Sequence, residues 1–175
     1  MAGFPGIIGG DSGNRTRNGF IDYNDAGTSS TPIALSANTW TTITNNGAGA
    51  FTNKSYPPSG VTELMDVSTG AFDPTQLDFG DTMLIRNDFS VTPSTNNSLL
   101  ELRYQLGSSS GSYTLQKTVS RLDSGSGIPY RFSLEPDQIY MGDSNTRDNP
   151  ITLQLRLSGS GTVVNAGSAI TVVKR

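Results

Sequence analysis

Residues 81–106, DTMLIRNDFSVTPSTNNSLLELRYQL, contain two runs in which apolar and polar residues alternate. The apolar members are Met83, Ile85, Phe89 and Val91 in the first run, interrupted by Asn87, and Leu100, Leu102, Tyr104 and Leu106 in the second. Successive side chains of a β-strand point to opposite faces, so each run can bury one face of a strand. Between the runs, residues 92–96 contain a proline and polar residues, which is typical of a turn. The stretch therefore predicts an antiparallel β-hairpin.

Shorter strand-like runs occur on both sides of this stretch. They cover residues 20–24, 33–35, 40–43, 51–56, 113–119, 130–134, 138–141, 151–157, 162–164 and 169–173. The long alternating runs lack the i, i+3, i+4 and i+7 spacing of apolar residues that an amphipathic helix requires. The connections differ widely in length, which favours a jelly roll over an up-and-down barrel. We predict an all-β fold, an antiparallel two-sheet jelly-roll sandwich over residues 20–175, preceded by an extended N-terminal arm over residues 1–19.

The composition fits one domain and argues against two classes of partner. The chain has 175 residues, of which 34% are hydrophobic and 15% charged, and its formal net charge is -3. Nucleic-acid binding needs clustered Lys and Arg residues, and the twelve in this acidic chain are spread out. No run approaches the roughly 20 apolar residues of a membrane span. We expect neither nucleic acid nor membrane as a partner, and the lack of cysteine leaves the redox compartment open.

The first 19 residues are rich in glycine and contain no alternating run, so they cannot bury a face by themselves. One interpretation is a frayed terminus, because disorder concentrates at chain ends. The other is an arm that becomes ordered on a partner. The candidate binding residues of such an arm are the apolar anchors Phe4, Ile7 and Ile8 and the charged residues Arg15 and Arg17.

The residue types that most often carry catalysis are missing, since the chain has no histidine and no cysteine. Paired carboxylates could still act on a glycosidic bond. The candidates lie around predicted turns, where aspartate commonly caps a loop: Asp66, Asp73, Asp78 and Asp81. Residues 143–149 offer oxygen ligands but depart from the EF-hand pattern, so a hydrogen-bonded loop is favoured over a calcium site. We expect no enzymatic activity, no cofactor and no metal.

Several short signatures resemble those of small jelly-roll proteins from tailed bacteriophages. They are DYND at residues 22–25, STPI at 30–33, NNGAGAFTN at 45–53, FGDTMLIR at 79–86 and IYMGD at 139–143. The resemblance spans roughly residue 20 to the C-terminus and leaves the arm outside. It implies a homotrimeric capsid decoration (cement) protein, or a head or tail fibre module, located on the virion. For a decoration protein, the implied partner is the major capsid protein, bound through the arm.

Two alternatives stay open. In a fibre or receptor-binding module, the polar loops at residues 107–112 and 142–150 would face the host. In a carbohydrate-binding module, aromatic rings would stack on sugar, and the candidates are Trp40, Tyr104, Tyr130 and Tyr140. We favour a core or subunit-contact role for Trp40, the single tryptophan, because aromatic side chains usually bury.

Overall fold

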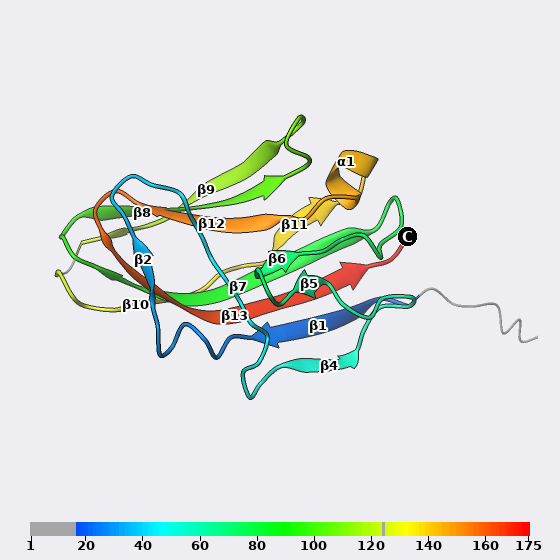
Figure 1. The fold of residues 1–175 in the computed structure, drawn as a ribbon, viewed down its shortest axis with the longest axis horizontal. Coiled ribbons are helices and arrows are strands. Elements are labelled where there is room, and N and C mark those ends of the chain that lie inside the picture. The colour runs from blue at the N-terminus through cyan, green and yellow to red at the C-terminus, as the bar shows by residue number, and fades with distance from the viewer. Residues whose placement is uncertain (1–16, 124) are drawn as a thin grey trace, which may run out of the picture.

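The computed structural model describes residues 17–123 and 125–175, and most of its strands form two antiparallel sheets packed as a sandwich (Figure 1). The larger sheet contains β1 (Gly19–Asn24), β2 (Ile33–Leu35), β4 (Asn53–Tyr56), β7 (Thr82–Pro93), β10 (Tyr130–Ser133), β11 (Asp137–Tyr140) and β13 (Gly161–Val173). The smaller sheet contains β3 (Thr41–Thr42), β8 (Ser98–Leu106), β9 (Tyr113–Leu122) and β12 (Thr152–Leu157). The remaining described elements are a small hairpin of β5 (Met65–Asp66) and β6 (Ala71–Phe72), and the helix α1 (Ser144–Arg147).

The order of strands across the two sheets is that of a jelly roll. In the larger sheet β2 pairs with β13, β13 with β7, and β7 with β10. In the smaller sheet the order is β3, β12, β8, β9. The chain therefore passes from one sheet to the other at β2–β3, β3–β4, β7–β8, β9–β10, β11–β12 and β12–β13, and so wraps around a common core. The predicted all-β, antiparallel two-sheet architecture is confirmed. Most of the predicted arm lies outside the described residues, and Gly19 already belongs to β1.

Residues 81–106 form two strands as predicted, but these strands do not pair with each other. β7 bonds to β10, β11 and β13 in the larger sheet. β8 bonds to β9 and β12 in the smaller sheet. The predicted hairpin is therefore wrong, because residues 94–97 carry the chain between sheets. Alternation determines which face a strand buries, but it leaves the hydrogen-bonding partners of that strand undetermined.

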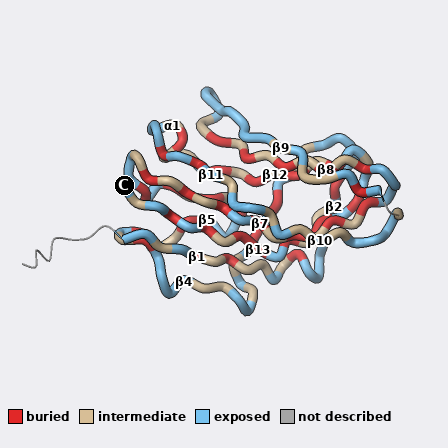
Figure 2. Tube along the Cα trace, turned by 180° about the vertical axis from the view of Figure 1, so that it is seen from behind, coloured by how far each residue is buried: buried red, intermediate tan, exposed pale blue. Residues whose placement is uncertain are grey.

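The alternating residues form the apolar layer between the sheets. From β7 and β8 this layer receives Met83, Ile85, Phe89, Val91, Leu100, Leu102, Tyr104 and Leu106, each at most 3% exposed. Figure 2 shows buried segments alternating with more exposed ones along the long strands. Burying a large apolar side chain contributes about 1.5–3 kcal/mol, so this layer is the main source of stability.

Asn87, which interrupts the apolar pattern of β7, points into the same layer and is fully buried. Its amide nitrogen donates to the Tyr104 hydroxyl at 2.6 Å, and its amide oxygen accepts from Ser168 Oγ at 2.8 Å. The Tyr104 hydroxyl donates in turn to Asp137 at 3.0 Å. Burial raises the pKa of Tyr104, and the charge of Asp137 raises it further. Because these buried groups have partners, the cost of removing them from water is offset.

The two runs at residues 162–164 and 169–173 belong to one strand, β13, and not to two as predicted. The pairing of β13 with β7 shifts register between Asn165 and Gly167. Such a bulge inserts an extra residue and bends the strand locally. The break in apolar pattern is therefore a feature within a strand and not the end of one.

Residues 143–149 contain a short helix in place of the predicted hydrogen-bonded loop. Asp143 is the N-cap of α1, and its carboxylate accepts a hydrogen bond from Thr146 N at 2.8 Å. Aspartate at this position satisfies a backbone N–H that has no partner inside the helix. Over the described ranges, no helix is long and apolar enough to cross a membrane.

Candidate functional site

Only one candidate binding residue of the arm lies within the described residues. The other four lie outside them: Phe4, Ile7, Ile8 and Arg15. Arg17 is exposed, and its backbone is joined to Ser59. Arg17 N donates to Ser59 Oγ at 3.0 Å, and Ser59 N donates to Arg17 O at 3.1 Å. These two bonds determine where the arm joins the domain, and we call this point the arm junction.

A groove opens beside the arm junction. Its volume is about 730 Å³, and residues 17–20 and 55–62 line it. The two segments approach closely at Gly19, where a Cβ atom would overlap Pro58 N and would lie 2.6 Å from Tyr56 O. Glycine is the residue that allows two backbones to come so near. The groove is thus formed by the start of β1 and the loop that follows β4.

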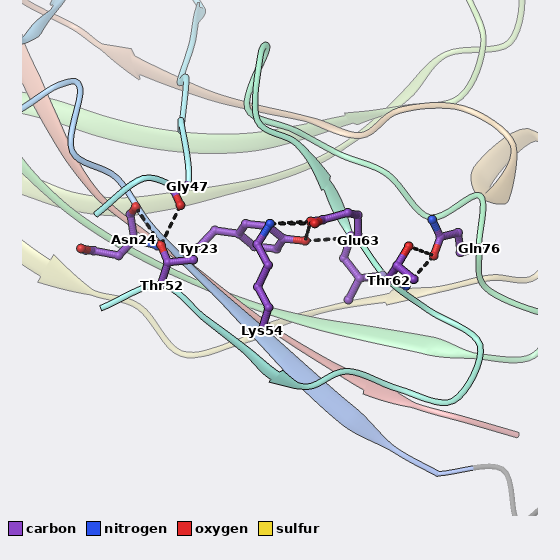
Figure 3. A network of polar contacts seen from close by, with 9 residues as sticks. Tyr23, Asn24, Gly47, Thr52, Lys54, Thr62, Glu63 and Gln76 are labelled. Carbon is purple, nitrogen blue, oxygen red and sulfur yellow. Dashed lines mark hydrogen bonds and ion pairs between the residues drawn. The ribbon is translucent and has the colours of Figure 1, made fainter. Parts of the chain in front are cut away.

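The loop that follows β4 is held on β1 by the phenol of Tyr23 (Figure 3). Tyr23 Oη donates to Glu63 Oε2 at 2.8 Å and accepts from Leu64 N at 2.7 Å. Lys54 Nζ binds Glu63 at 2.7 Å and lies 5.1 Å from the centre of the Tyr23 ring. Burial by itself would raise the pKa of Glu63, but hydrogen bonds from Lys54 and Tyr23 outweigh it and lower the pKa. Glu63 is therefore ionised at neutral pH and keeps the loop attached to β1 and β4.

Apolar side chains gather on the outer face of the larger sheet next to the groove. We call these residues the apolar patch: Phe20, Tyr56, Leu84, Tyr140 and Val173. All but Leu84 are between 38% and 64% exposed. The rings of Phe20 and Tyr56 stack with their centroids 5.8 Å apart and their planes at 27°. Exposed apolar patches on a soluble domain commonly mark a surface that another molecule covers.

Strand register brings the members of the apolar patch together. The neighbours across the sheet are Tyr56, Phe20, Thr171 and Leu84 in one row, and Val173, Thr82 and Tyr140 in the next. Five different strands contribute, so no local stretch of sequence shows the patch. Sequence reasoning missed it for this reason, although outward-facing aromatic residues within a strand are a weak signal that could have pointed to it.

The C-terminal residues lie at the edge of this surface. Lys174 N donates to Asn18 Oδ1 at 2.8 Å, which joins the end of the chain to the arm junction. The Lys174 side chain is only 3% exposed, and its Nζ forms ion pairs with Asp81 at 2.7 Å and Asp78 at 3.1 Å. Burial would lower the pKa of Lys174, but hydrogen bonds to Asp81 and Asp78 outweigh it and raise the pKa. Figure 1 shows the C-terminus and the beginning of β1 at the same end of the molecule.

The four aspartates considered for catalysis make structural contacts. Asp66 and Asp73 accept hydrogen bonds from hydroxyl and backbone N–H groups of the residues that follow them in their turns. Asp78 and Asp81 bind Lys174. Within residues 17–123 and 125–175, no group of three or more His, Cys, Asp or Glu side chains is placed to hold a metal ion.

The four aromatic residues considered for sugar binding do not share a surface. Tyr104 is buried between the sheets, and Tyr130 is partly buried and packs against the core. Tyr140 belongs to the apolar patch on the larger sheet. Trp40 is half-buried beside two arginines of the smaller sheet and lies outside the core. A row of sugar-stacking rings is therefore not formed.

Known proteins resemble this chain in structure, and only loosely. No known family model matches the sequence, and no curated protein does so either. Similar solved structures include that of infectious bursal disease virus, Gx strain, with a TM-score of 0.43 and 13% sequence identity. A mutant VP2 protein of that virus, in T=1 particles, has a TM-score of 0.45 and 13% identity. The structure of the Gt strain has a TM-score of 0.40 and 15% identity. Each alignment covers 97% of this chain but only 36% to 38% of the other chain. Superpositions at this level do not establish a shared fold, and no function follows from them.

Proposed function

We propose that this protein is a structural component of a virus particle, a homotrimeric capsid decoration (cement) protein of a tailed bacteriophage. In this proposal the N-terminal arm binds the major capsid protein, and the domain lies on the outer surface of the head. The observation that carries the proposal is the apolar patch beside the arm junction. The jelly-roll order of strands and the phage-like signatures in the sequence agree with it.

The geometry suits a trimer whose arms act together. Covering the apolar patch with a neighbouring subunit removes exposed aromatic surface from water, which favours association. Because Ser59 fixes the backbone at Arg17, each arm leaves its domain at a defined point. Three arms on one trimer bind with avidity, so that each can be weak on its own. Ligands that bind only the assembled shell stabilise that shell by mass action.

The arm hypothesis predicts that a variant lacking residues 1–16 remains folded but loses its affinity for head shells. The loss should be at least about tenfold, because all three contacts of a multivalent complex disappear together. Co-sedimentation with shells assembled from the major capsid protein alone would measure the loss.

Two further variants distinguish the contribution of the apolar residues of the arm from that of its charged residues. Replacing Phe4, Ile7 and Ile8 with serine removes the apolar anchors, whereas Arg15→Gln with Arg17→Gln removes the charges. Loss of binding in the charge variant alone, together with wild-type binding that weakens as the salt concentration rises, would assign the contact to electrostatics. Undiminished binding by the variant that lacks residues 1–16 would contradict the role of the arm.

The trimer hypothesis predicts a solution mass three times that of the 18.5 kDa chain. Replacing Phe20 and Tyr56 together with serine should shift the protein to the monomer mass, because the stacked pair supplies two of the three aromatic rings of the apolar patch. Phe51→Ser is the control, since Phe51 is 81% exposed and lies outside the patch. Light scattering after gel filtration measures the masses, and a cooperative thermal transition shows that the domain stays folded. A trimer that survives the double substitution would contradict this interface.

One observation favours a fibre or receptor-binding module as the second candidate. The loops at residues 107–112 and 142–150 are joined, because Ser108 N donates to Asn145 Oδ1 at 3.0 Å and Asn145 Nδ2 donates to Gly111 O at 2.8 Å. The two loops thus form one polar surface that a host molecule could contact. Electron microscopy of intact particles distinguishes the candidates, since a decoration protein covers the head and a fibre module occurs in few copies at one end.

A further inference from the structure

Trp40 lies beside two guanidinium groups on the outer face of the smaller sheet. The Cζ atoms of Arg103 and Arg156 are 4.4 Å and 4.9 Å from the centre of the indole ring. Arg103 belongs to β8 and Arg156 to β12, and both occupy outward positions between buried neighbours of their strands. The sheet thus holds one aromatic ring and two fixed positive charges together.

Positive charge exceeds negative charge at this place. Arg156 Nε donates to Glu101 Oε2 at 2.8 Å, so its charge is compensated. Arg103 Nε donates to the neutral amide of Gln154 at 2.7 Å, and within the described residues Arg103 forms no ion pair. Burial lowers the pKa of Arg103, and the charge of Arg156 lowers it further. An anion that reached Arg103 would therefore relieve an uncompensated charge.

The residues around the two arginines are amides and hydroxyls held in place by hydrogen bonds. Gln154 Nε2 donates to Thr42 Oγ1 at 3.2 Å, and Gln116 Nε2 donates to Glu101 Oε1 at 3.1 Å. Such side chains exchange hydrogen bonds readily with the hydroxyl groups of a sugar. An aromatic ring adds a flat apolar surface with a specific geometry.

We propose that this face, with Trp40 and Arg103 at its centre, binds a saccharide that carries a carboxylate, such as a uronic or sialic acid. The carboxylate pairs with the Arg103 guanidinium, the ring of the sugar lies on Trp40, and the surrounding amides contact hydroxyl groups. A planar guanidinium suits a carboxylate because it can donate two parallel hydrogen bonds. This activity is separate from the proposed attachment to the head, because it uses the opposite sheet and not the arm. It would let a particle-bound protein adhere to an acidic glycan surface.

The experiment compares matched sugars by titration calorimetry with the full chain. The probes are tri-galacturonate against its methyl ester, and 3′-sialyllactose against lactose. We expect the acidic sugars to bind with a Kd of about 1 mM or tighter, and the neutral partners to bind about tenfold more weakly, as the loss of one charged hydrogen-bonded pair implies. Arg103→Gln should abolish the preference for the acidic sugars, and Trp40→Ala should weaken binding of every sugar in the set.

Arg131→Gln is the matched control, because it removes the same charge from an exposed position on the larger sheet and should leave binding unchanged. Thermal unfolding checks that each variant is folded. Binding of neither acidic sugar at about 10 mM would overturn the proposal, since a Kd above that concentration is more than about tenfold weaker than the affinity expected. Equal binding of acid and ester, or full competition by acetate alone, would overturn it as well. Tighter binding of hexaglutamate than of the sugars would assign the face to an acidic protein instead.

Discussion

Asp81→Asn should lower the free energy of unfolding by about 3 kcal/mol, because it removes one member of a buried ion pair and leaves the buried Lys174 charge with only the exposed Asp78 as an ionic partner. The Asp81 side chain is 1% exposed and that of Lys174 3%. The Asp81 carboxylate also accepts hydrogen bonds from Arg175 N at 3.0 Å and Asp78 N at 2.9 Å. Urea denaturation measures the change, and the slope of the transition should stay the same.

Asp78→Asn provides the control for this prediction. Asp78 contacts the same Lys174 Nζ at 3.1 Å, but its side chain is 81% exposed. Exposed ion pairs contribute about 0–1 kcal/mol, so the control should change stability little. If Asp81→Asn and Asp78→Asn lower the free energy of unfolding equally, the buried pair has no special role.

The same pair gives stability a defined dependence on pH. Burial would raise the pKa of Asp81, but hydrogen bonds from Lys174 and from backbone N–H groups outweigh it and hold the pKa below the ordinary value of 3.8. The contribution of Asp81 is therefore present above pH 3.8 and is lost as the pH falls through the lower value of the folded state. The pKa of Lys174 is raised above 10.5, so its contribution is complete below that pH and is lost as the pH rises through the folded value. Asp81→Asn should flatten the acid limb of the stability curve.

Alternation in residues 81–106 correctly predicted the buried faces of β7 and β8. It could not predict their partners, because the hydrogen bonds of a sheet are made by the backbone and carry no side-chain signature. Asn87 is a second feature that the alternation of apolar and polar residues does not predict. Its position interrupts the apolar pattern, yet it is buried because Tyr104 and Ser168 satisfy its amide. Those partners come from β8 and β13, at distant points of the chain.

The candidate site was predictable only in part. The sequence drew attention to the arm; the backbone of Arg17 lies at the arm junction, and its role as a charged contact stays a prediction. The apolar patch depends on the register of five strands, so only the fold reveals it. The general tendency of aromatic residues to bury favours a core or subunit-contact role for Trp40. The structure places Trp40 outside the core, beside Arg103 and Arg156, where the guanidinium groups cover part of the ring, and its role in a subunit contact stays a prediction.

Gly167 explains why the sequence pattern predicts two strands where the protein has one. It follows Asn165 and Ala166 in a stretch that lacks the apolar alternation of its flanks, and it lies at the bulge of β13 with φ at 142°. A glycine inside a strand pattern indicates a bulge as readily as a turn. The backbone of β1 runs directly past this point, since Gly167 pairs with Asn24.

Gly167→Ala should therefore destabilise the domain by about 3 kcal/mol or more, because it combines a strained φ with a steric clash. A Cβ atom here would overlap Tyr23 O and would lie 2.9 Å from Asn24 Cα, and neither backbone atom can move without disturbing β1. Gly60→Ala is the matched control, since Gly60 has a φ of 77° and no atom lies within 4 Å of the position that an added methyl group would take. That variant should lose only about 1 kcal/mol, the cost of a left-handed conformation alone. If urea denaturation gives the two variants the same loss, close packing of β13 against β1 is not what requires glycine at the bulge.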